Sequence, residues 1–258
     1  MRLKGEDFMC IDVISRMFAD YKVFPEEAFR EYSPLRVFQK LYPDNYYSIE
    51  VEELIKLQKY KQITRGADLP WWGKEFFQCN EKNKVMIISQ DSLSEDAGSI
   101  VFWSQLYGVI NSKEEYESYN TLLGQKKLFS YNSWNKVNKQ LGEWNIDLNN
   151  CYITDAAKVY KESSYKDRDF DNAKSKELLV AEIEVCKPNL IILLGGQPLR
   201  LLVPKIIYSD AVDSGEYQDF NGVKVVISPF ITGQGHTQKN YKERLDIASR
   251  LIKNTLKQ

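Results

Sequence analysis

Four short segments hold the polar side chains best placed to bind a ligand or do chemistry. These segments are residues 89–94, 154–158, 195–197 and 228–236. They include the carboxylates of Asp91 and Asp155 and the only histidine of the chain, His236. A carboxylate accepts hydrogen bonds, and an imidazole changes its charge near neutral pH. If the four segments meet in the fold, they can form one site for a polar ligand.

Each polar segment begins where an apolar run ends, and these runs have the pattern of buried strands. The four runs are residues 84–89, 151–154, 189–194 and 223–228. Helical periodicity is found between and after them, at residues 171–186, 197–203 and 239–256. This alternation predicts a three-layer α/β/α domain around a short, mainly four-stranded parallel sheet. Ligands bind at the carboxyl ends of such strands, where the polar segments lie.

Residues 1–80 have a different character from the rest of the chain. Their apolar residues recur at helical spacing, and prolines interrupt the region. We therefore expect two parts: a mostly helical N-terminal extension over 1–80, packed on the core, and an α/β domain over 81–258. Within the extension, Trp71 and Trp72 are expected to be packing residues.

The composition excludes several classes of protein. The 258 residues carry a formal net charge of −1, which rules out a strongly basic nucleic-acid coat but allows a local basic face. The longest aliphatic run, residues 190–194, is too short to cross a membrane. The four cysteines form no CxxC pair, so we expect no metal site, and nothing implies a cofactor. With no targeting signal visible, we expect a cytoplasmic protein.

Taken in order, the four segments resemble the uracil-DNA glycosylase superfamily over roughly residues 80–256. Residues 89–94 (SQDSLS) stand where the family has its water-activating loop, often GQDPYH. Residues 154–158 (TDAAK) stand at its T-N-x-x-K pattern, and residues 187–202 resemble its KPxLIILLG strand and short helix. Residues 229–233 (PFITG) stand at its P-H-P-S-G loop. The resemblance implies the family's α/β fold and a divergent member.

Asp91 is, by this resemblance, the catalytic carboxylate. Breaking the glycosidic bond of a deoxynucleoside develops positive charge on the sugar and negative charge on the leaving base. A carboxylate beneath the sugar stabilises that cation and orients water. The backbone N–H of Gln90 would then donate to a carbonyl of the base. The alternative is structural, because Asp is also common in turns and at helix N-caps after strands.

Phe102 stands where the family stacks a phenylalanine on the extruded base. An aromatic face contributes about 1–3 kcal/mol per stacked base. The alternative is that Phe102, Trp103 and Tyr107 form the core face of a helix. We expect Trp103 in the core, and both roles stay open for Phe102.

Asp155 departs from the family, which commonly has Asn at this position. An amide can donate to uracil O4 and accept from N3–H, whereas an ionised Asp only accepts. It would repel O4 but could accept from the exocyclic amine of cytosine or adenine. We therefore hypothesise that uracil is not the preferred base. A cap of the following segment, or a pair with Lys158, is an equally weighted alternative.

Other departures from the family also concern the base pocket. Ser92 and Leu93 stand where stringent uracil enzymes have Pro and Tyr, and a leucine would admit substituents at the pyrimidine 5-position. Phe230 replaces the family's His, which donates to the base O2 in the transition state. His236, six residues on, is the candidate to take over this task or to contact a phosphate, although a lone loop histidine is often simply solvated.

Candidate DNA contacts follow the predicted site segments. By the logic of base extrusion, Ile231 and residues 233–235 form a minor-groove wedge with a flexible hinge. The DNA-binding candidates are Lys158, Thr232, Gln234 and Lys239, with Lys161, Lys166, Arg168, Lys242 and Arg244 as further phosphate contacts. A solvated surface is the alternative for these charges.

The combined prediction is a DNA glycosylase with a catalytic pair, Asp91 and His236, and a set of base-binding residues. That set is Gln90, Phe102, Asp155 and Phe230. We expect a monomer that acts on DNA, flips a base and needs no cofactor. Two alternatives stay open: an inactive family member that binds nucleic acid or a nucleotide, and a nucleoside or nucleotide hydrolase of similar architecture.

Overall fold

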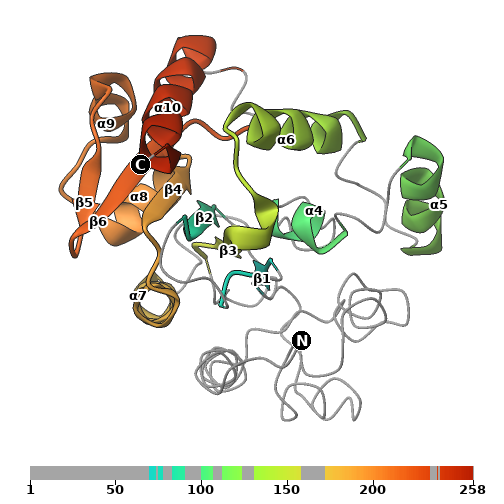
Figure 1. Cartoon of the computed structure of the whole chain (residues 1–258), viewed down its shortest axis with the longest axis horizontal. Coiled ribbons are helices and arrows are strands. Elements are labelled where there is room, and N and C mark those ends of the chain that lie inside the picture. The colour runs from blue at the N-terminus through green and yellow to red at the C-terminus, as the bar shows by residue number, and fades with distance from the viewer. Residues whose placement is uncertain are drawn as a thin grey trace.

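The described part of the chain is built around one six-stranded sheet in a computed structural model (Figure 1). The structure describes residues 70–73, 75–77, 83–90, 100–106, 112–123, 131–157, 172–232, 237 and 239–257. The strand order across the sheet is β1-β3-β2-β4-β6-β5. The predicted α/β class is confirmed, and the predicted helical extension falls almost entirely outside the described residues.

Four parallel strands form the centre of the sheet and match the four predicted runs. In spatial order they are β3 (Cys151–Asp155), β2 (Val85–Ser89), β4 (Leu190–Leu194) and β6 (Val223–Ser228). Every residue of β2, β3 and β4 is buried, so both faces of the central sheet are covered. This burial explains why the runs are continuously apolar instead of alternating. The three-layer arrangement itself stays a prediction.

Two antiparallel edge strands bring the sheet to six strands, two more than expected. β5 (Gln218–Phe220) joins β6 through Asn221 and Gly222, whose φ angles of 51° and 86° suit the two-residue turn that Asn-Gly favours. β1 (Trp71–Trp72) pairs with β3 at the other edge. Its tryptophans are only 3% and 2% exposed, which confirms that they are packing residues. Trp71 and Trp72 therefore belong to the same sheet as the four parallel strands.

Helices connect the strands and cover them. They are α4 (Ile100–Leu106), α5 (Lys113–Leu123), α6 (Tyr131–Glu143), the 3₁₀ helix η2 (Leu148–Asn150), α7 (Asn172–Cys186), α8 (Gly196–Leu202), α9 (Tyr208–Ser214) and α10 (Tyr241–Leu256). The three helices predicted between and after the strands correspond to α7, α8 and α10. α7 ends at Cys186, as the restriction on the residue before Pro188 predicts. α9 and α10 lie beside β5 and β6, at one end of the sheet in Figure 1.

The order of the strands creates a switch point at β2. The chain passes from β2 to β3 on one side, then crosses back to β4 on the other side. The connections therefore leave the carboxyl ends of β2 and β4 in opposite directions. In open parallel sheets, this divergence is where ligands bind.

Cys151 and Cys186 are buried, and neither takes part in a disulfide. Burial raises the pKa of the Cys151 thiol, so it stays protonated and packs as a small apolar side chain. Along the described residues, none of the helices is both long enough and apolar enough for a membrane crossing.

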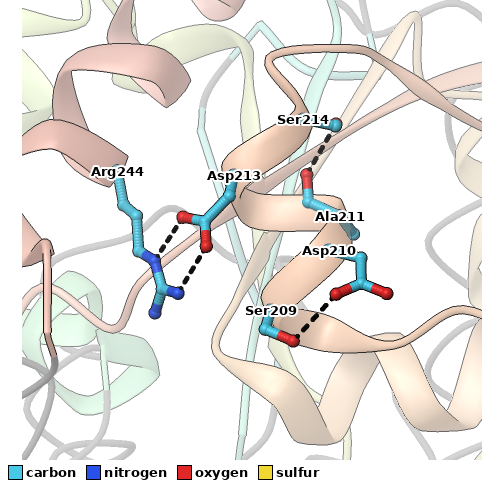
Figure 2. Close-up of polar contacts among 6 residues, drawn as sticks. All are labelled: Ser209, Asp210, Ala211, Asp213, Ser214 and Arg244. Carbon is cyan, nitrogen blue, oxygen red and sulfur yellow. Dashed lines mark hydrogen bonds and ion pairs between the residues drawn. The ribbon is translucent and has the colours of Figure 1, made fainter.

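An ion pair joins α9 to α10 (Figure 2). The Arg244 guanidinium donates from Nε to Asp213 Oδ1 at 2.6 Å and from its second terminal nitrogen to Oδ2 at 2.7 Å. It also lies over the ring of Tyr208, 5.9 Å from the ring centroid. The hydrogen bonds from Arg244 hold the pKa of the Asp213 carboxyl below its usual range. Arg244, a predicted phosphate contact, therefore has a structural partner within the fold.

We expect Asp213→Asn to lower the free energy of unfolding by about 0.5–1 kcal/mol at pH 7, because Asp213 is 45% exposed and solvent screens the pair. A folded-state pKa below the unfolded value of about 4 stabilises the fold above that pH. The contribution is lost as the pH falls through the folded-state pKa, so the gap to wild type should close in acid. Urea denaturation from pH 7 downward measures it, with exposed Asp246→Asn as the control. A gap that is constant with pH would contradict this account.

Candidate functional site

The carboxyl ends of the central strands bring three polar side chains onto one face of the sheet. In the strand register, Ser89 is opposite Asp155, and Leu194 is opposite Ser228. Ile88 is opposite Leu193, so Ser89 also stands beside Leu194. Side chains that pair across strands point to the same face. Asp155, Ser89 and Ser228 thus share one face at this edge, and all three are fully buried.

The pairing of β2 with β3 continues beyond the last strand residue and fixes the backbone of Gln90. The N–H of Ala156 donates to the Ser89 carbonyl at 3.0 Å. One residue on, the N–H of Ala157 donates to the Gln90 carbonyl, also at 3.0 Å. Gln90 immediately precedes Asp91, so the start of the predicted catalytic turn is held in register with the chain that follows Asp155.

The side chain of Gln90 packs against Gly195 at the switch point. A Cβ atom added at Gly195 would lie only 2.7 Å from Gln90 Nε2. Gly195 also has φ 88° and ψ −176°, a conformation that is open essentially to glycine alone. Its N–H donates to the Ser228 carbonyl at 2.8 Å. Through Gly195, the ends of β2, β4 and β6 are joined at one place.

Asp155 is the carboxylate that the described structure places beside this turn. Its oxygens are buried, and its chain neighbours Ala156 and Ala157 are buried as well. A carboxylate in such surroundings has a strong requirement for hydrogen-bond donors. The alternative pair with Lys158 lies outside the described residues.

A second buried carboxylate, Glu182 of α7, was not found from the sequence. Its Oε1 accepts hydrogen bonds from the hydroxyls of Tyr152, at 2.7 Å, and Thr154, at 2.9 Å. A signal was present, because Glu182 lies four residues after Leu178 and four before Cys186, on the helix's apolar stripe. A charged residue at such a position is rarely buried unless it is paired.

The segment after β6 differs from the predicted wedge. Ile231 is 2% exposed and belongs to the core, so it does not project toward DNA. Thr232 is 3% exposed, which points its side chain into the protein instead of toward a phosphate. Phe230 is half-buried and packs against the core. Ile231 therefore packs as a core residue, and residues 233–235 of the predicted wedge lie outside the described part of the chain.

Tyr241, at the start of α10, anchors this segment. Its hydroxyl donates to the Ile231 carbonyl at 3.0 Å. Burial, with a smaller effect of Tyr208, raises the pKa of Tyr241 to about 12, so the hydroxyl keeps its proton at physiological pH. Lys239, just before α10, is exposed and free of the core, as a DNA contact requires.

The remaining predicted site residues cannot be placed in this geometry. Asp91, Lys158, Gln234 and His236 lie outside the described residues. Phe102 belongs to α4, but its side chain is not among those that the structure describes. Its neighbour Trp103 is fully buried, which confirms the predicted core role. The described residues also bring no three His, Cys, Asp or Glu side chains into a group able to hold a metal ion.

A family model described as the uracil DNA glycosylase superfamily matches residues 76–251. The chain belongs to this superfamily. The match extends from just after β1 into α10, so it includes all four parallel strands and the edge at which Ser89, Asp155 and Gly195 meet. A search of curated proteins finds no match to the chain. Superfamily membership supports DNA binding and glycosylase-like chemistry, and leaves the base to be identified.

We expect Gly195→Ala to lower the free energy of unfolding by about 2–3 kcal/mol, because it adds backbone strain and displaces Gln90. Gly222→Ala is the matched control: its φ is also positive, at 86°, but no atom lies within 4 Å of an added Cβ, so about 1 kcal/mol is expected. Adding Gln90→Ala should recover part of the Gly195→Ala loss in urea denaturation. Equal losses in both glycine variants, with no recovery, would show that the contact is unimportant.

Proposed function

We propose that this protein is a DNA glycosylase that extrudes a base other than uracil and hydrolyses its N-glycosidic bond. The observation that carries the proposal is the position of Gln90. It stands at the switch point, where its side chain packs on Gly195 and its carbonyl accepts a hydrogen bond from the N–H of Ala157. Ligands of open parallel sheets bind at such a switch point, and Asp91 immediately follows Gln90 in the sequence, which supports its proposed catalytic role.

In the proposed reaction, water attacks C1′ of the deoxyribose and the bond from C1′ to the base nitrogen breaks. The bonding electrons leave with the base, the sugar takes the hydroxyl, and the base finally takes the proton. Asp91 would lie under the sugar, stabilise its positive charge and orient the water. A backbone N–H at Gln90 would donate to a base carbonyl as negative charge develops there.

Asp155 would read the edge of the base. An ionised carboxylate accepts from an exocyclic amine or a ring N–H, but repels the O4 carbonyl of uracil. Phe102 would stack on the base, and Leu93, in place of the family's Tyr, would leave room for substituents at the 5-position. This set of groups favours an amino-bearing, or modified, pyrimidine.

The DNA around the flipped nucleotide would be held by basic and polar groups near the same edge. Lys158, Gln234 and exposed Lys239 are the proposed phosphate contacts. His236 would supply the charge or the donor that the family takes from the residue replaced here by Phe230. Because Thr232 is buried, we do not propose that its side chain contacts DNA.

A second function, base or nucleotide binding without catalysis, is favoured by one observation. Phe230 stands at the family's His and packs against the core, so this position supplies no donor to the base O2. One lost donor can lower a rate by about 10²–10³-fold. The test below separates slow catalysis from its absence.

The test is base release from oligonucleotides that each carry one candidate base, including cytosine, 5-substituted pyrimidines, adenine and uracil. Abasic sites are cleaved with alkali and counted under single-turnover conditions. We expect wild type to release at least one of them, and Asp91→Asn to be slower by about 10³-fold or more, because the cation loses its counter-charge. Salt-dependent DNA binding should persist in the variant. Equal rates in wild type and variant would exclude Asp91, and DNA binding with no release by wild type would favour the binding function.

A further inference from the structure

Glu182 lies on the opposite face of the sheet from Asp155. It is 0% exposed, and one oxygen, Oε1, accepts from both Tyr152 and Thr154 of β3. Side chains alternate between the faces along a strand, so Asp155, next to Thr154, points the other way. A single carboxylate oxygen thus ties α7 to two residues of β3, Tyr152 and Thr154.

The tied end of β3 leads directly into the site. Asp155 follows Thr154, and the next two residues donate their N–H groups to the carbonyls of Ser89 and Gln90 at 3.0 Å. A shift of Thr154 along the strand would therefore move the Asp155 carboxylate. The same shift would reach Gln90 through the hydrogen bond from Ala157.

Packing alone does not require a carboxylate at this position. Glu182 interrupts the apolar stripe of α7, and taking a carboxylate out of water is costly even when it is hydrogen-bonded. A leucine would continue the stripe without that cost. Two hydroxyl donors on the strand that carries Asp155 give the carboxylate a different task.

We propose that Glu182 is a positioning residue of the base site: by holding Thr154, it sets where Asp155 and Gln90 stand. The inference rests on the proposed function for its effect on base release. It goes beyond that function because Glu182 has no part in the proposed contacts with base or sugar and acts through the opposite face of the sheet.

Two variants that each remove one donor to the same oxygen provide the test. Thr154→Val keeps the shape of the side chain, and Tyr152→Phe keeps the ring. Since Thr154 adjoins Asp155 and Tyr152 is three residues away, single-turnover base release should fall about 10-fold or more in Thr154→Val and less than about 3-fold in Tyr152→Phe. DNA affinity should stay within about 2-fold in both.

Variants of the acceptor complete the design. Glu182→Gln keeps an acceptor oxygen and should remain close to wild type, whereas Glu182→Leu should lose rate as Thr154→Val does. Glu184→Gln, at an exposed position of the same helix, is the control and should be unchanged. Wild-type rates in both Thr154→Val and Glu182→Leu would overturn the inference. The inference would also be overturned if, across all the variants, the fall in the rate of base release simply followed the fall in the free energy of unfolding.

Amide hydrogen exchange keeps the inference testable if wild type releases no base, an outcome that would defeat the proposed function alone. In Thr154→Val, the amides of Ala156 and Ala157 should exchange faster than in wild type, while those of β4 keep their protection. Unchanged exchange at both alanines would overturn the positioning role.

Discussion

The site depends on the hydrogen bond from the Ala157 N–H to the Gln90 carbonyl, one residue beyond the end of the sheet. It extends the pairing of β2 and β3 by one residue beyond the end of each strand's ladder. The backbone of Gln90 is held by this hydrogen bond, and its side chain packs against Gly195. A residue with a Cβ atom at position 195 would leave no room for the Gln90 amide. Gln90 is thus tied to both neighbouring strands, β3 and β4. This is the kind of preorganisation that electrostatic catalysis needs.

Polar groups gather at this edge at a cost to stability. One face of this edge buries three polar strand residues, Ser89, Asp155 and Ser228. Glu182 of α7 is buried against the other face. The Ser89 hydroxyl is among these fully buried polar groups. The apolar centre of the sheet and the aromatic packing of Trp72 on Tyr152 offset such costs. Stability concentrated in the middle of the sheet allows polarity at its end.

The sequence predicted the parts of the fold that a strong local pattern specifies. β2, β3, β4 and β6 were predictable because strands buried on both faces are continuously apolar, and their order along the chain located the site. β1 was missed because two residues make no pattern, and β5 because its exposed edge position leaves it little apolar character. The burial of Ile231 and Thr232 could not be predicted, because a loop has no periodicity to show which side chains turn inward. Glu182 was missed although its charge falls on the apolar stripe of α7, a position where a carboxylate is rarely buried unless it is paired.

We propose that Asp155, held at this edge beside Gln90, reads the base. The most direct test is the ratio of single-turnover release rates for cytosine-type bases and uracil, measured for wild type and Asp155→Asn with the same oligonucleotides. Wild type should favour the amino-bearing base. The amide of the variant can donate to O4, so the ratio should fall by about 10²-fold or more. An identical ratio in both proteins, with both active, would contradict the account.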